Sequence, residues 1–147
     1  MKEGHGNEKW PDGSVYVGEY QNSLKHGKGK FKWANRSHFE GDFSENDIHG
    51  HGTYNWADGR QYSGSWKRNK KSGPGRFTWK DRRSYEGQYF NDNKHGRGIF
   101  TWPDGKIYDG LWENGKQKGE GLHTEKGITR KGVWKDGECV KWSDGKP

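Results

Sequence analysis

The sequence predicts an all-β protein: an elongated, single-layer antiparallel sheet of stacked β-hairpins, about 12 strands in all, twisted or curved so that one face forms a groove. Three observations predict this fold. A unit of 23 residues recurs along the chain. Within each unit, aromatic residues and glycines alternate with polar residues, which is the period of a β-strand. Turn-forming dipeptides such as Asp-Gly separate the alternating runs.

The repeat is the first feature to settle, because a period of this size decides the architecture. The chain is expected to form a single domain, 1–147, with a half-repeat or cap at each end, 1–15 and 130–147. The full repeats cover 16–38, 39–61, 62–84, 85–107 and 108–129.

Each repeat is expected to hold two strands. The first carries an aromatic residue at position 1, glycine at position 3 and a second aromatic residue at position 5, as in Tyr85, Gly87 and Tyr89. The second carries glycines at positions 12 and 14 and, in four copies, aromatic residues at positions 16 and 18, as in Phe100 and Trp102. Positions 6–13 are polar and are predicted to form a long loop between the strands.

The junction between repeats is expected to be a tight turn, because Asp-Gly readily supplies the positive φ that such turns require. Asn35-Arg36 and Asp81-Arg82 replace Asp-Gly in two copies, and a looser turn is predicted there.

Aromatic residues must supply most of the core. Only 25% of the residues are hydrophobic, yet the chain contains nine Trp, seven Tyr and six Phe. Each aromatic side chain buries roughly 150–250 Å². Glycine at position 3 leaves room for a neighbouring ring to lie over the backbone, and the opposite face of the sheet is expected to be wet.

At these positions the chain resembles a known family. The units YEGQYFNDNKHGRGIFTWPDG and FEGDFSENDIHGHGTYNWADG are similar to MORN repeats, which open with aromatic-Glu-Gly-Glu/Asp-aromatic and continue with His-Gly-x-Gly. The resemblance implies a non-catalytic scaffold or adaptor that contacts protein partners or phosphoinositides, at membranes or in cilia and the cytoskeleton. Because some members are attached to lipid kinases or methyltransferases, a regulatory domain of a larger enzyme is an alternative.

The main hypothesis is that an extended or helical segment of a partner protein binds along the grooved aromatic face. One sheet layer does not cover a row of aromatic rings, and exposed apolar patches usually mark interfaces. The expected anchors lie in the middle of the array: Trp33, Tyr54, Trp56, Trp66, Phe77 and Trp79.

A second hypothesis is peripheral binding of anionic phospholipid. The net charge of the chain is +7, and the third repeat alone holds eight basic residues and one acidic residue. A cluster of basic residues attracts an anionic membrane surface. The candidate residues are expected on the long loop of that repeat: Lys67, Arg68, Lys70 and Lys71.

No other class of site is predicted: no catalytic residues, metal, cofactor, small-molecule substrate or nucleic acid. His26, His49 and His95 recur with the repeat, too far apart to share a metal ion. Cys139 is the only cysteine. With no apolar run of transmembrane length and no secretory signal, a cytoplasmic location is expected. The axoneme of a cilium and the cytoplasmic face of a membrane are the alternatives.

Overall fold

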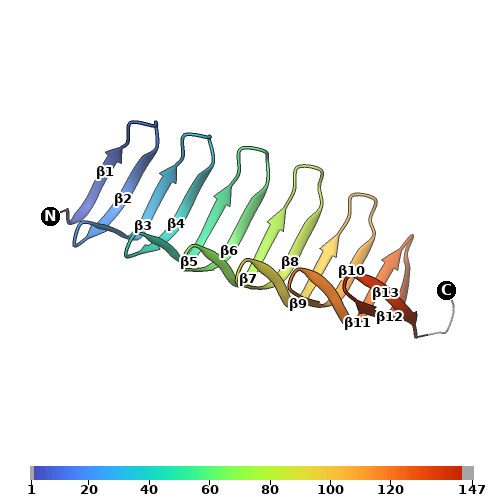
Figure 1. Ribbon diagram of the computed structural model, residues 1–147. Helices are drawn as coiled ribbons and strands as arrows, with labels where there is room; N and C mark the ends of the chain where they lie inside the picture. Colours follow the sequence, from blue (N-terminus) through green and yellow to red (C-terminus); the bar gives the residue numbers. More distant parts are fainter. Residues whose placement is uncertain (1, 144–147) are drawn as a thin grey trace. The chain divides into compact units, whose positions relative to one another are not determined.

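A computed structural model of the protein describes residues 2–143, which contain 13 β-strands and no helix (Figure 1). The chain divides into two compact units, Met1–Lys71 and Ser72–Pro147, called unit 1 and unit 2 below. In each unit the strands lie side by side in chain order, and every strand runs antiparallel to its neighbour. The predicted all-β fold of stacked hairpins is therefore confirmed.

Unit 1 is built from six strands and the first residues of a seventh. The six are β1 (Gly4–Lys9), β2 (Val15–Gln21), β3 (Leu24–Lys32), β4 (His38–Ser44), β5 (Asp47–Asn55) and β6 (Gln61–Lys67). Their order in the sheet follows the chain.

Unit 2 continues with β7 (Lys70–Thr78), which begins at the boundary between the units. It then contains β8 (Ser84–Phe90), β9 (Asn93–Thr101), β10 (Ile107–Glu113), β11 (Lys116–Glu125), β12 (Ile128–Lys135) and β13 (Glu138–Trp142). These strands also pair in chain order. The aromatic residue Trp142 of β13 packs against Trp134 of β12, with ring centroids 5.7 Å apart.

Glycines of neighbouring strands face each other, and an aromatic ring lies over them. Gly18 in β2 pairs with Gly29 in β3, and the ring of Tyr16 covers both. A Cβ atom on Gly29 would collide with the Tyr16 ring. The Tyr16 hydroxyl donates a hydrogen bond to the carbonyl of Glu19 at 2.9 Å. The prediction that position 3 makes room for a ring is confirmed, and Tyr62, Tyr85 and Tyr108 donate the equivalent bond.

The core consists of the rings at positions 1 and 5. Tyr16, Phe39, Tyr62, Tyr85 and Tyr108 are the largest fully buried side chains. Their partners at position 5 meet them edge-on; the rings of Tyr16 and Tyr20, for example, lie 5.2 Å apart at 81°. Such T-shaped contacts are favourable for aromatic pairs.

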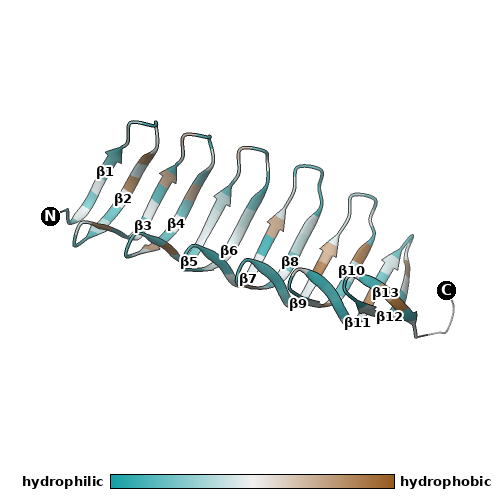
Figure 2. Cartoon of the chain, viewed as in Figure 1, coloured by the Kyte–Doolittle hydropathy of each residue, from teal (hydrophilic) through white to brown (hydrophobic). Residues whose placement is uncertain are grey.

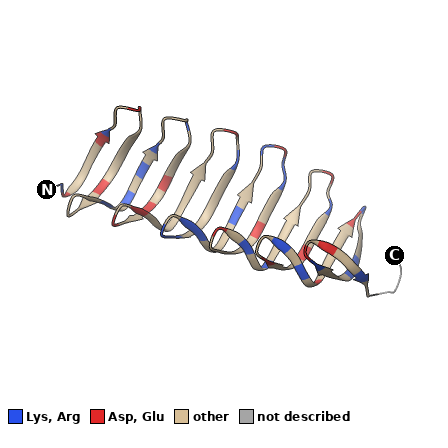
Figure 3. Ribbon diagram, viewed as in Figure 1, with Lys and Arg blue, Asp and Glu red and all other residues tan. Residues whose placement is uncertain are grey.

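The other face of the strands is mostly polar, as predicted, although Val17, Ile99, Leu111 and Leu122 are exposed on it. Figure 3 shows basic and acidic residues interspersed along the strands, and hydrophobic residues occupy only separate segments of the strands in Figure 2. Several opposite charges pair across neighbouring strands, such as Lys30 with Glu40 at 3.8 Å. Exposed pairs of this kind contribute about 0–1 kcal/mol each, so the aromatic core provides most of the stability.

The turn inside each repeat is much shorter than predicted. Only two residues separate β2 from β3, Asn22 and Ser23, and both have positive φ. Most of the polar stretch at positions 6–13 therefore extends the second strand, so the prediction of a long loop is wrong. Tight turns with two positive φ angles match the twist of the strands they join, and Asn and Asp tolerate that backbone.

The five junctions that open with Trp10, Trp33, Trp56, Trp79 and Trp102 share one conformation, including the two for which a looser turn was predicted. The N–H of Trp102 donates to the carbonyl of Lys106 at 2.9 Å, and the N–H of Gly105 donates to the carbonyl of Trp102 at 3.0 Å. The same two bonds close the turns that contain Arg36 and Arg82. These two arginines have φ of 75° and 79°, in the region that favours glycine. The prediction of looser turns is wrong.

Replacing Arg36 with glycine should stabilise the protein by about 0.5–1 kcal/mol. The change removes the cost of a left-handed backbone, about 1–2 kcal/mol, and loses part of that gain to the greater freedom of glycine in the unfolded chain. Urea unfolding measures the difference. Gly13→Ala is the matched control: its Cβ would meet no atom within 4 Å, but its φ is +96°, so this variant should be less stable. An Arg36→Gly variant no more stable than the parent would contradict the account of the turn.

Stability should fall as the pH rises from about 10 to 12. Burial is the main reason that the pKa of Tyr16 and Tyr108 rises from 10.0 to about 12. The folded state therefore holds these protons more tightly than the unfolded state, and the resulting stabilisation is complete below pH 10 and lost as the pH passes 12. The urea midpoint should decline less steeply in Tyr16→Phe, although lysines lose charge in the same range in both proteins. Equal slopes for the two proteins would contradict the prediction.

Candidate functional site

Five aromatic rings of unit 1 form a continuous row that the fold leaves half-exposed. The row consists of Trp10, Phe31, Trp33, Tyr54 and Trp56, and is called the aromatic row of unit 1 below. Neighbouring ring centroids along it lie 5.4, 4.6, 5.0 and 4.4 Å apart. Among the described residues of unit 1, no other set of half-exposed side chains makes such a series of aromatic contacts.

The local fold explains why these rings gather. Phe31 and Tyr54 lie near the ends of β3 and β5, and each tryptophan is the first residue after a strand, where it opens the turn between repeats. The buried rings support the row from the same face: Tyr16 lies 6.4 Å from Phe31, and Trp66 lies 6.0 Å from Tyr54. Burial raises the pKa of Tyr54, and a hydrogen bond with Ser37 opposes this shift, so its phenol stays neutral at physiological pH.

Cations lie against the rings of this row. The Lys25 ammonium is 5.8 Å from the centroid of Trp10 and 5.7 Å from that of Phe31. The Arg60 guanidinium lies 5.0 Å from Trp56, held there by its ion pair with Asp58 at 2.8 Å. Burial lowers the pKa of Lys25. Cation–π contacts contribute roughly 0.5–2 kcal/mol, depending on desolvation.

The lysines at position 10 were not predicted to reach the rings, because the sequence pattern placed them in a loop. Tyr20 pairs with Lys25 and Tyr89 pairs with Lys94, so position 10 lies in a strand on the aromatic face. Ile48 fills the same position in the second repeat and is buried. An isoleucine within a polar stretch was the signal that could have revealed this.

Unit 2 contains a shorter equivalent row: Phe77, Trp79, Phe100 and Trp102. Their ring centroids lie 4.3, 5.5 and 4.5 Å apart. Phe77 and Phe100 are buried, with exposed fractions of 6% and 7%, which leaves only the two tryptophans half-exposed. The Lys94 ammonium lies 5.3 Å from Trp112 and 5.7 Å from Tyr85. Unit 2 therefore offers less aromatic surface than unit 1.

The six predicted anchors divide into surface and core. Trp33, Tyr54 and Trp56 belong to the aromatic row of unit 1, and Trp79 is half-exposed in unit 2. Trp66, only 6% exposed, donates its indole N–H to the carbonyl of Gly52 at 3.1 Å. Like Phe77 it supports the surface and does not form it. Trp10 and Phe31 were not among the named anchors, although they stand at the same repeat positions as Trp33 and Tyr54.

The four candidate lipid-binding residues of the third repeat lie at a tight turn and the strand ends beside it. Lys67 ends β6, Arg68 is in the turn, and Lys70 and Lys71 begin β7. Arg68 forms ion pairs with Glu45 at 3.9 Å and Asp47 at 3.6 Å. The ammonium of Lys71 lies 5.8 Å from the centroids of Trp56 and Tyr62. Two of the four residues thus already interact within the protein, and lipid binding remains a hypothesis.

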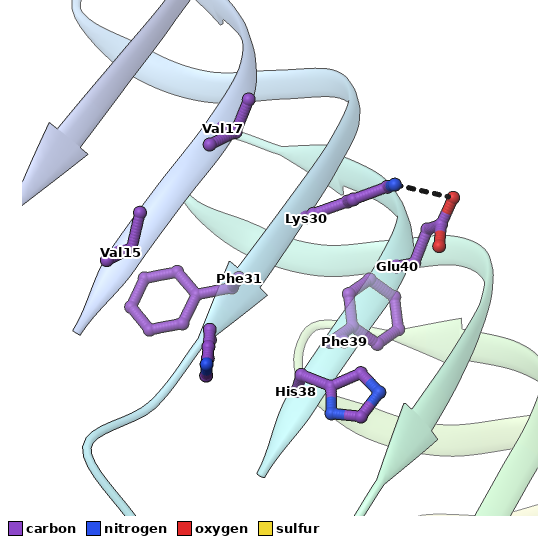
Figure 4. A pocket seen from close by; sticks show the side chains of 8 residues that line it. Val15, Val17, Lys30, Phe31, His38, Phe39 and Glu40 are labelled. Atoms are coloured by element: carbon purple, nitrogen blue, oxygen red, sulfur yellow. Dashed lines mark ion pairs between the residues drawn. The ribbon is translucent and has the colours of Figure 1, made fainter. Parts of the chain in front are cut away.

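A hollow that shares Phe31 with the aromatic row of unit 1 lies beside β2, β3 and β4. It has a volume of about 410 Å³, and Val15, Val17 and Phe31 provide much of its apolar lining. Figure 4 shows the Lys30–Glu40 ion pair at its edge. Among the described large hydrophobic residues of unit 1, Val17 is the one that is exposed, at 50%. Lys30, Lys32, His38 and Glu40 also line the hollow, so its lining is partly charged.

The ionisable groups do not favour a catalytic role. Within residues 2–143, no three His, Cys, Asp or Glu side chains lie close enough together to hold a metal ion. Hydrogen bonds and ion pairs lower the pKa of several carboxyl groups in that range: Glu8, Asp12, Asp58, Asp81 and Glu113. Partial burial acts to raise the pKa of Asp42, but hydrogen bonds from Lys28 and from the His51 backbone outweigh it, so the pKa is lowered. None of these groups is suited to donate a proton at neutral pH.

The described residues contain no helix that is both long enough and apolar enough to cross a membrane.

Repeating hairpins with aromatic rings over paired glycines define a β-repeat protein. The family model for the MORN repeat matches six segments: 1–15, 16–38, 39–59, 62–82, 85–107 and 108–124. These segments make up most of the sequence, so the chain belongs to the MORN repeat family. A search of curated proteins found no match.

Two solved structures have a similar fold. One is the TCP domain of SAS-4 (dCPAP) from Drosophila melanogaster in complex with a proline-rich motif of Ana2 (dSTIL): TM-score 0.57, 10% identity, covering 88% of this chain and 73% of that one. The other is the TCP10 domain of Danio rerio CPAP in complex with a STIL peptide: TM-score 0.53, 12% identity, covering 89% of this chain and 60% of that one. At this identity the likeness concerns the fold.

Proposed function

We propose that this protein is a non-catalytic binding module that holds a peptide segment of a partner protein on the aromatic row of unit 1. The observation that carries the proposal is the row itself: five half-exposed rings in consecutive contact on one face of a sheet. A half-covered row of large aromatic side chains is rarely left open on a soluble domain unless it binds something. Trp and Tyr are also the residues that most often dominate binding energy at interfaces.

The mode of binding follows from the shape of the row. The row runs from the end of β1, past the end of β3, to the end of β5, so it crosses the strands of the sheet. A peptide segment that does not fold on itself could contact all five rings, whereas the convex surface of a folded protein would contact only some of them. The two structural neighbours were each solved in complex with a peptide or short motif, which supports a peptide as the partner of this fold.

Catalysis is not proposed. The acidic groups with shifted pKa values stay ionised at neutral pH, and the one hydroxyl group of the row, that of Tyr54, stays protonated. The function proposed here is recognition, in which buried apolar area and ring contacts provide the affinity.

A library of random peptides displayed on phage, selected on the whole chain, tests the proposal. The selected peptides should bind the parent protein and lose about thirtyfold in affinity to Trp33→Ala, because a central interface tryptophan typically contributes about 2 kcal/mol or more. Fluorescence anisotropy with labelled peptides measures the loss, and circular dichroism confirms that the variant is folded.

The control is Phe90→Ala. Phe90 is an aromatic residue that is 62% exposed and lies outside both rows, so its removal tests for a general effect of losing a ring. Binding should be unchanged in this variant. A selection that yields no binders, or binders that Trp33→Ala holds as tightly as the parent, would overturn the proposed site.

A further inference from the structure

The spacing of the tryptophans in unit 1 selects one peptide conformation. Trp10, Trp33 and Trp56 recur once per hairpin, and two strand spacings amount to roughly 9.6 Å. Tyr54 lies between them, 5.0 Å from Trp33 and 4.4 Å from Trp56, so these two tryptophan rings are at most about 9.4 Å apart. A ligand that presents the same group to each tryptophan must therefore repeat at about this distance.

Three regular conformations can be compared with that distance. A polyproline II helix has three residues per turn and rises about 3.1 Å per residue, so one turn covers roughly 9.3 Å. A β-strand covers the same distance in about 2.9 residues and turns its third residue to the opposite side. An α-helix needs about 6.4 residues, which is not a whole number, so it drifts out of phase. Only the polyproline II helix stays in phase along the row.

The hydrogen-bonding groups of the row suit the same ligand. Buried Trp66 and Trp112 donate their indole N–H groups to the carbonyls of Gly52 and Gly98, each at 3.1 Å. Within residues 2–143, the indole N–H groups of Trp10 and Trp33 donate to no protein acceptor. Neither nitrogen is among the buried atoms that lack a hydrogen-bond partner, so both indole N–H groups are accessible. A polyproline II backbone has no internal hydrogen bonds, so its carbonyls can accept from these indoles.

The cations along the row add a charge preference. Lys25 lies beside Trp10 and Phe31, and Arg60 and Lys71 lie beside Trp56. A lysine or arginine of the ligand placed there would meet these like charges, whereas a carboxylate could pair with Lys25, although Asp58 already pairs with Arg60 and Glu8 lies near Lys25. Neutral or acidic residues between the prolines therefore suit the surface.

We propose that the segment bound by the aromatic row of unit 1 is a polyproline II helix with proline at every third residue, one proline for each hairpin. This inference rests on the proposed function and specifies its ligand. Proline rings are apolar and fit against aromatic faces, and the preformed helix loses little entropy on binding. The neutral or acidic residues between the prolines face away from the rings or toward the cations.

Two synthetic peptides of twelve residues test the register. The first has proline at every third position, with alanine and glutamate between. The second has the same composition, with its prolines alternately two and four residues apart. The first should bind the whole chain about tenfold more tightly in fluorescence anisotropy, and this preference should disappear in Trp33→Ala and persist in Phe90→Ala. Trp33→Phe keeps a ring but lacks the N–H donor, so it should retain the preference with several-fold weaker affinity.

The outcomes separate this inference from the proposed function. Equal affinity for the two peptides overturns the proline register, as does a set of phage-selected peptides that need Trp33 but lack proline. Where binding still depends on Trp33, the aromatic row remains the binding site. If no peptide of any kind depends on Trp33, the register and the proposed function fail together. Tighter binding when lysine replaces glutamate would overturn the charge preference.

Discussion

The fold depends on one close contact, an aromatic ring packed over a pair of facing glycines. In the first repeat, Tyr16 covers Gly18 and Gly29, and its hydroxyl bonds to the backbone beyond them. Any side chain at either glycine would occupy the space of the ring. Glycine weakens a strand because it has no side chain to pack, and here the ring supplies the missing packing. A chain with few aliphatic residues thereby builds a core from one aromatic layer.

The same contact explains why a surface is left for binding. The rings at positions 1 and 5 occupy the space above the glycines and become buried, as Tyr16 and Tyr20 do. The rings at positions 16 and 18 come later in the repeat, where strands end and turns begin. They pack on the buried layer from one side and, in unit 1, remain half-exposed on the other. Structure and candidate function thus arise from the same repeat.

The sequence was sufficient to predict the fold class, the antiparallel hairpins and the ring over glycine. Each depends on the local alternation of aromatic residues and glycines with polar residues. The turns were harder. Asn22-Ser23 forms a tight turn although it lacks the Asn-Gly sequence that would predict one. Arg36 adopts a backbone conformation that favours glycine because two hydrogen bonds close its turn. For the candidate site, sequence position selected Trp33 and Trp56, both half-exposed in the structure. It could not reveal that Trp66 is buried, since burial depends on how neighbouring strands pack.

A double-mutant cycle on Gly29 and Tyr16 tests the central contact most directly. The three atoms that a Cβ at Gly29 would meet first all belong to the Tyr16 side chain. Gly29→Ala should therefore cost about 2–3 kcal/mol of unfolding free energy in the parent protein. In a Tyr16→Leu background, whose shorter side chain leaves that space open, the same change should cost at least about 1 kcal/mol less. An equal cost in both backgrounds would contradict the account.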